Sequence, residues 1–124
     1  LIKRLTSNGV MVSQSGPTGP DSYSECFTAV ANTIQLAFPG FAAYHVFVPS
    51  FASTWGFTQG SMNLSAFKTC SEDVNTKLAH RNVAGLKMYD GITHEGLFSL
   101  PVYLRRAMGN ETRIITESEP LFVF

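Results

Sequence analysis

Charge is scarce in this chain, and its two signs cancel. Among 124 residues there are nine Lys and Arg against nine Asp and Glu, and no run of Lys or Arg exceeds the pair Arg105-Arg106. Binding to nucleic acid or to an anionic membrane surface needs a concentrated basic face. A membrane span needs roughly 18 to 20 apolar residues in a row, and no run approaches that length. We therefore expect neither nucleic acid nor a membrane among the partners.

Cysteine is also rare. Cys26 and Cys70 are too few for a disulfide framework, and their spacing is not that of metal ligands. We expect both to be reduced thiols in a cytoplasmic protein. His45, His80 and His94 are scattered, with no carboxylate or thiolate at ligand spacing, so structural or surface roles are favoured over a metal site.

The first half of the chain alternates strand and helix patterns. Residues 10–15 form a short apolar run that predicts a strand, and a loop rich in Gly and Pro follows. Ser22 and Glu25 have capping-box spacing, which predicts the start of a helix that ends before Pro39. Residues 41–48 are aromatic and β-branched, typical of a strand. This order predicts an α/β protein.

A second strand is expected over residues 55–60, after a bend that begins at Pro49. Two strands joined by so short a bend must run antiparallel. Further on, Ser71 is expected to cap a helix that ends near residue 80. Residues 86–90 predict a short strand or an extended segment, and helices are expected over 93–99 and 101–108. Residues 1–9 look like the last turns of a helix, which suggests that a preceding part is absent.

Four motifs carry a resemblance to a known family. They are Gly-Val-Met-Val-Ser-Gln-Ser-Gly at 9–16, Val-Pro-Ser-Phe-Ala-Ser-Thr-Trp-Gly-Phe at 48–57, Tyr89-Asp90-Gly91 with His94, and Leu-Pro-Val-Tyr-Leu-Arg-Arg-Ala at 100–107. In this order they resemble the C-terminal half of the spermidine synthase family of polyamine aminopropyltransferases. The bend and the tail are most similar to thermospermine synthase-like members.

The resemblance implies both a fold and a reaction. The fold is the C-terminal part of a methyltransferase-like Rossmann domain, a mostly parallel sheet ending in an antiparallel strand pair, with residues 1–124 as one portion of it. The reaction moves an aminopropyl group from decarboxylated S-adenosylmethionine to putrescine or spermidine and releases 5′-methylthioadenosine. Decarboxylated S-adenosylmethionine is a cosubstrate, and no metal or redox cofactor is implied.

Three residues match substrate-binding positions of the family. Gln14 corresponds to a glutamine that helps to hold the amine, Phe51 stands where many members have a tyrosine, and Trp55 is placed to wall the polyamine channel. A blander interpretation makes Gln14 a polar strand end and the two aromatics a hydrophobic core or lid. The catalytic carboxylates and the nucleotide loop are expected upstream of Leu1, so we expect this chain alone to be inactive.

The central strands of the expected sheet would also lie upstream of Leu1. Without them, the strand predicted at residues 10–15 would have an unpaired edge, which proteins normally avoid. We therefore expect a partner there, either the N-terminal half or a second copy in a homo-oligomer. Two other functions stay open, namely an S-adenosylmethionine-dependent methyltransferase of the same fold and a non-catalytic interaction module. The amine that is used is also open.

Overall fold

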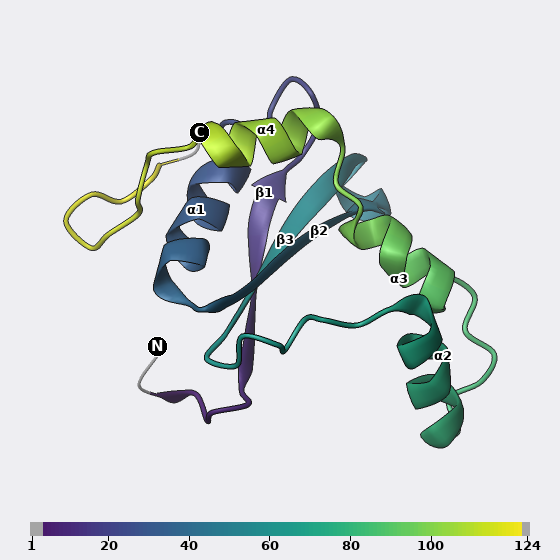
Figure 1. Ribbon diagram of the computed structural model, residues 1–124. Helices are drawn as coiled ribbons and strands as arrows, with labels where there is room; N and C mark the ends of the chain where they lie inside the picture. The colour runs from purple at the N-terminus through teal and green to yellow at the C-terminus, as the bar shows by residue number, and fades with distance from the viewer. Residues whose placement is uncertain (1–3, 123–124) are drawn as a thin grey trace.

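The computed structural model describes residues 4–122 of the chain. Its elements follow in the order β1 (Val10–Pro17), α1 (Phe27–Ala37), β2 (Gly40–Val48), the 3₁₀ turn η2 (Pro49–Phe51), β3 (Ser53–Ser61), α2 (Ser71–His80), α3 (Gly91–Phe98) and α4 (Val102–Asn110). Figure 1 shows α1 on one side of the strands and α2 and α3 on the other. None of the helices in residues 4–122 is long and apolar enough to cross a membrane.

The three strands form one sheet in the order β1-β3-β2. β3 runs antiparallel to both neighbours, pairing Gln14 with Phe57 on one side and Tyr44 with Phe57 on the other. The expected α/β class and antiparallel strand pair are confirmed. Because β3 lies between β1 and β2, those two strands run parallel to each other without touching. Ser15 forms a bulge where the β1–β3 register shifts between Gln14 and Gly16.

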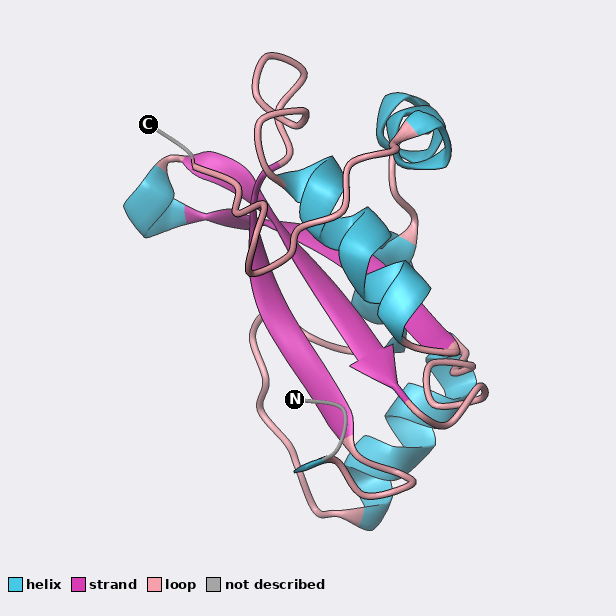
Figure 2. Ribbon diagram, turned by 90° about the vertical axis from the view of Figure 1, so that its left-hand side faces the viewer, coloured by secondary structure: helices cyan, strands magenta, loops and turns pink. Residues whose placement is uncertain are grey.

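Helix α1 packs across one face of this sheet (Figure 2). The side chain of Phe27 is fully buried, and Ile34 and Phe38 are nearly so. The helix approaches closely because β3 presents glycine to it: a Cβ on Gly56 would collide with Phe27, and one on Gly60 would collide with Phe38. The core on this face also contains Leu100 and Leu104, which lie before and within α4.

The predicted start of α1 is wrong. The capping box at Ser22 and Glu25 does not form; the Ser22 hydroxyl donates to the Asp21 carboxylate instead, at 3.1 Å. Residues 20–26 make turns, and the helix begins at Phe27 after Cys26, which provides no side-chain cap. Burial of the Phe27 ring against Gly56 fixes the first helical turn more strongly than a surface cap does.

The opposite face of the sheet is covered by α3 over β2, and α2 packs on α3. Asp90 caps α3 by accepting the backbone N–H of Thr93 at 2.8 Å. Residues 86–90 are exposed, with bends at residues 87, 88 and 90, and they form no strand. The α2 prediction is confirmed in extent, but its cap is Cys70, one residue before the expected Ser71.

Hydrogen bonds hold the segment after α4 against α1. Thr28 donates to the Glu111 carboxylate at 2.6 Å, Asn32 donates to the backbone carbonyl of Arg113 at 2.8 Å, and the Ile115 N–H donates to Thr33 at 2.9 Å. At the other end, residues 4–9 make turns and no α-helix. The remainder of the expected N-terminal helix, residues 1–3, and the end of the tail, residues 123–124, lie outside the described residues.

Candidate functional site

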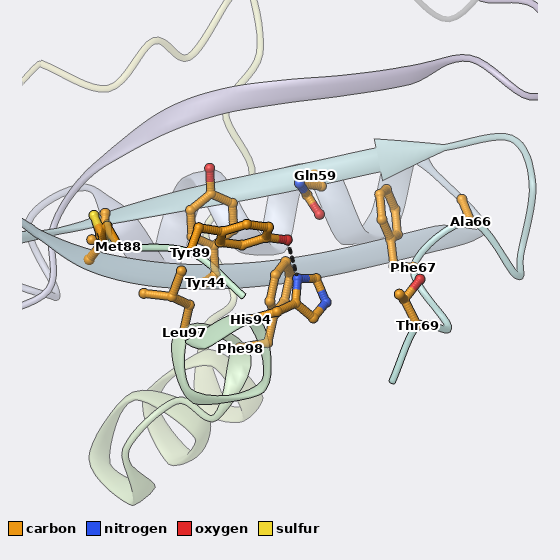
Figure 3. Close-up of a pocket in the computed structure, with 11 residues that line it drawn as sticks. Tyr44, Gln59, Ala66, Phe67, Thr69, Met88, Tyr89, His94, Leu97 and Phe98 are labelled. Carbon is orange, nitrogen blue, oxygen red and sulfur yellow. Dashed lines mark hydrogen bonds between the residues drawn. The ribbon is translucent and has the colours of Figure 1, made fainter. Parts of the chain in front are cut away.

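A cavity of about 420 Å³ lies on the sheet face opposite α1. Its floor comes from β2 and β3, one wall from α3 and the segment before it, and the other from residues 66–69 (Figure 3). Aromatic side chains dominate the lining, which comprises Tyr44, Val46, Gln59, Ala66, Phe67, Thr69, Met88, Tyr89, His94, Leu97 and Phe98.

The floor follows from strand alternation. Glycines 56 and 60 of β3 face α1, so Phe57 and Gln59 face the other way. On β2 the ring of Tyr44 stacks on Phe57, with ring centres 5.1 Å apart and planes 12° apart. Desolvation by burial, with a smaller contribution from Tyr89, raises the pKa of Tyr44. The Tyr44 phenol is therefore neutral at physiological pH and presents an uncharged ring to the cavity.

The wall from α3 has one hydrogen bond between side chains of the lining. The Tyr89 hydroxyl lies 2.8 Å from His94 Nδ1, as Figure 3 shows. His94 in turn packs on Phe98, with ring centres 4.6 Å apart. Phe98 reaches the floor, where its ring centre is 5.1 Å from that of Tyr44. The wall and the floor are thus joined by a continuous aromatic contact.

The chemistry of this lining favours binding over proton transfer. Within the described residues no carboxylate lines the cavity, and no group of three or more His, Cys, Asp or Glu residues is placed to hold a metal ion. Aromatic faces attract an ammonium group electrostatically and also cover apolar methylenes. A ligand with ammonium groups separated by runs of methylenes would make both kinds of contact with these rings.

Gln14 lies on the same sheet face as the cavity but does not line it. It is exposed on β1, directly opposite Phe57, which is directly opposite Tyr44. Two strand spacings separate Gln14 from Tyr44, about 10 Å. The row Gln14–Phe57–Tyr44 therefore runs from the exposed strand β1 to the cavity floor.

Phe51 and Trp55 pack together beside that row. Their ring centres are 4.6 Å apart at the bend where η2 leads into β3. Trp55 shares the cavity face and is paired with Val46, which lines the cavity. Its indole nitrogen Nε1 is buried and finds no hydrogen-bond partner in residues 4–122. Phe51 is 46% exposed.

Sequence reasoning missed Tyr44 and Phe98 as site residues, gave no role to Tyr89 and expected only a structural or surface role for His94. The motif Tyr89-Asp90-Gly91 with His94 was the available signal, because the Asp90 cap starts a helix on which His94 turns back toward Tyr89. Tyr44 had no comparable signal, since only the strand register shows which sheet face it occupies.

Comparison with known proteins gives a consistent result. Over 123 residues, 98% of its length, the chain is 31% identical to a polyamine aminopropyltransferase of Sulfurisphaera tokodaii. Over 117 residues, 94% of its length, it is 32% identical to a polyamine aminopropyltransferase of Sulfolobus acidocaldarius. The chain spans only 40% and 38% of these relatives. No family model matches it.

Solved structures share the fold. Spermidine synthase from Thermotoga maritima superposes with a TM-score of 0.64 at 21% identity, over 83% of this chain and 35% of that one. A spermidine synthase in complex with the transition-state analogue AdoDATO gives 0.62 at 20% identity, over 83% and 33%. The strands and helices described above therefore match part of a methyltransferase-like α/β fold.

Proposed function

We propose that this chain is the amine-binding portion of a polyamine aminopropyltransferase catalytic domain, with residues 1–124 as one part of that domain. The observation that carries the proposal is the aromatic cavity without carboxylates, in a chain whose relatives over nearly its whole length are named for this activity. A methyltransferase has only the shared fold in its favour.

The proposed reaction is a displacement at carbon. The neutral nitrogen of putrescine or spermidine attacks the methylene next to the sulfonium of decarboxylated S-adenosylmethionine. The new C–N bond forms as the C–S bond breaks, and 5′-methylthioadenosine leaves with the electron pair. A carboxylate outside this chain takes the proton from the attacking nitrogen. The contribution of residues 1–124 is to hold the amine in line with the reacting carbon.

In this proposal the cavity holds the amine by its chain and by its far ammonium group. Tyr44, Phe67 and Phe98 cover methylenes, and an ammonium over an aromatic face gains about 0.5 to 2 kcal/mol. Gln14 accepts a hydrogen bond from the nitrogen nearer to β1. Trp55 and Phe51 wall the side of the channel, and the buried Trp55 N–H is a donor that a group from outside residues 4–122 can satisfy.

The rest of the catalytic domain pairs with β1 in this account. Within residues 4–122 no strand hydrogen-bonds to the outer edge of β1. On the cavity face, Val10 and Val12 are 46% and 53% exposed beside Gln14. An open edge next to exposed valines is a surface that proteins normally cover. Further protein chain that supplies the nucleotide site and catalytic carboxylates would cover it, and a second copy is the alternative occupant.

A chimera tests the proposed function. The segment of the Sulfolobus acidocaldarius relative that matches this chain is replaced by residues 1–124, and release of 5′-methylthioadenosine is measured with putrescine and with spermidine. We expect amine-dependent release, and we expect Tyr44→Leu to weaken it while Ile92→Ala, a change at an exposed α3 position that does not line the cavity, does not. A folded chimera without activity, beside an active parent, would contradict the proposal.

The proposal also assigns the enzyme to the cytoplasm, which agrees with two cysteines that form no disulfide, Cys26 and Cys70.

A further inference from the structure

We propose that the Tyr89–His94 pair is the end wall of the amine cavity and limits the length of the amine that it accepts. This inference rests on the proposed function and deepens it. It assigns to His94 a positioning role that acts through the Tyr89 hydroxyl.

A second cavity lies behind the pair. It has a volume of about 260 Å³ and is lined by α2 residues and by Val83. Thr69, Tyr89 and His94 line both cavities. Of the two cavities, only the first reaches the sheet, at residues such as Tyr44, and only the second reaches α2, at residues such as Leu78. The shared side chains are therefore the partition between a sheet-side and an α2-side space.

The partition is held by a hydrogen bond more than by packing. The Tyr89 side chain is 38% exposed, yet its hydroxyl is fixed at 2.8 Å from His94 Nδ1, and the two rings meet at 81° with centres 6.0 Å apart. His94 is fixed in turn by its contact with Phe98. Without the hydrogen bond, the partly exposed Tyr89 ring is free to rotate away, and the two cavities become one longer channel.

The charges on the two sides differ. Within the described residues, no charged carboxylate, Lys or Arg side chain lines the first cavity, whereas Lys77 and Arg81 line the second. Asp73 interacts with Lys77 and offsets part of its charge. An ammonium group that passed the partition would still approach two cations, and like charges repel at this range. Both the wall and the cations behind it favour a short diamine over a triamine.

The test is calorimetric titration of the 124-residue chain with putrescine and with spermidine at one salt concentration. The quantity of interest is the ratio of the two dissociation constants, because a general loss of stability lowers both affinities together. His94→Ala removes the partition, and Tyr89→Phe keeps the ring but removes the hydrogen bond. His94→Asn keeps a hydrogen-bonding group near the position of Nδ1. His80→Ala is the matched control, an exposed histidine on α2 that lines neither cavity.

We expect the unmodified chain to prefer putrescine. His94→Ala should shift the ratio toward spermidine by roughly tenfold, the scale of discrimination by pocket shape. Tyr89→Phe should shift it in the same direction by less, while His94→Asn and His80→Ala should stay near the unmodified value. Binding of both amines with a ratio that neither His94→Ala nor Tyr89→Phe changes would overturn this inference alone. Failure of the unmodified chain to bind either amine would overturn the proposed amine cavity itself.

Discussion

The ring of Phe27 lies against the backbone of Gly56, with no room for a methyl group between them. Gly56→Ala must therefore push α1 away from β3, and overpacking of this kind costs about 1 to 3 kcal/mol. We expect this loss in the free energy of unfolding by urea. Gly96→Ala is the matched control, because nothing lies within 4 Å of a Cβ there. It should be neutral or stabilising by up to about 1 kcal/mol, as Ala replaces Gly in a helix. Equal effects at the two positions would contradict the packing described here.

Glu111 should make stability depend on acid pH. The side-chain hydrogen bond from Arg113, helped by one from Thr28, lowers the pKa of Glu111 to about 2. The folded-state pKa lies below the ordinary value of 4.5, so the stabilisation is fully present above pH 4.5 and is lost as pH falls toward 2. Glu111→Gln should cost on the order of 2 kcal/mol at pH 7, the range for hydrogen bonds to a charged group.

The check is urea unfolding of both proteins at several pH values between 7 and 2. The difference in the free energy of unfolding between the two proteins should be constant above pH 5. It should shrink below pH 5, because the Glu111 carboxylate becomes protonated as the pH falls toward 2. Glu117→Gln, at an exposed tail position, should give a small difference throughout. A Glu111→Gln deficit that persists unchanged to pH 2 would show that the carboxylate charge is not its source.

Trp55 is the only tryptophan in the sequence, so its fluorescence reports on one place. Phe51→Ala removes the ring that packs on it at 4.6 Å and should shift the emission to longer wavelength as the indole meets water. If both aromatics wall the channel, this variant should also bind putrescine more weakly. Phe47→Ala, at an exposed β2 position outside the cavity, should do neither. A red shift with unchanged amine affinity would leave the two rings with a structural role only.

Gln14 is expected to contribute to amine binding through one hydrogen bond. Gln14→Ala should weaken putrescine binding about fivefold, equivalent to about 1 kcal/mol for a neutral hydrogen bond. The variant should unfold like the unmodified chain, since the Gln14 side chain is exposed. Gln35→Ala, at an exposed position on α1 and on the other side of the sheet, is the control. Equal affinities for the two variants would favour the interpretation of Gln14 as a polar strand end.

Local patterns predicted which segments are helices and strands better than where they begin. Residues 41–48 and 71–80 were found because β-branched and aromatic runs and acidic helix starts are local signals. The start of α1 was missed because the burial of Phe27 against Gly56, 29 positions away, decides it. A local cap at Ser22 cannot compete with that contact.

The site was harder to predict from the sequence, because it too depends on how separate segments pack together. Gln14, Phe51 and Trp55 were chosen through a family resemblance, and all three remain proposals. The cavity itself depends on β3 lying between β1 and β2, which brings Tyr44 and Gln59 onto one face. No short-range pattern encodes that register. The bond between Tyr89 and His94 spans only five positions, but its place beside the sheet depends on how α3 packs on β2.

The most direct test of the central claim is an amide NMR titration of the isotope-labelled chain with putrescine. We expect saturable shift changes that cluster at Tyr44, Gln59, Thr69, Tyr89 and Leu97, with smaller changes at Gln14. A cluster at residues 112–116 and 119–121, which line a separate cavity beside α1, or no change at any concentration, would contradict the claim that the aromatic cavity is an amine site.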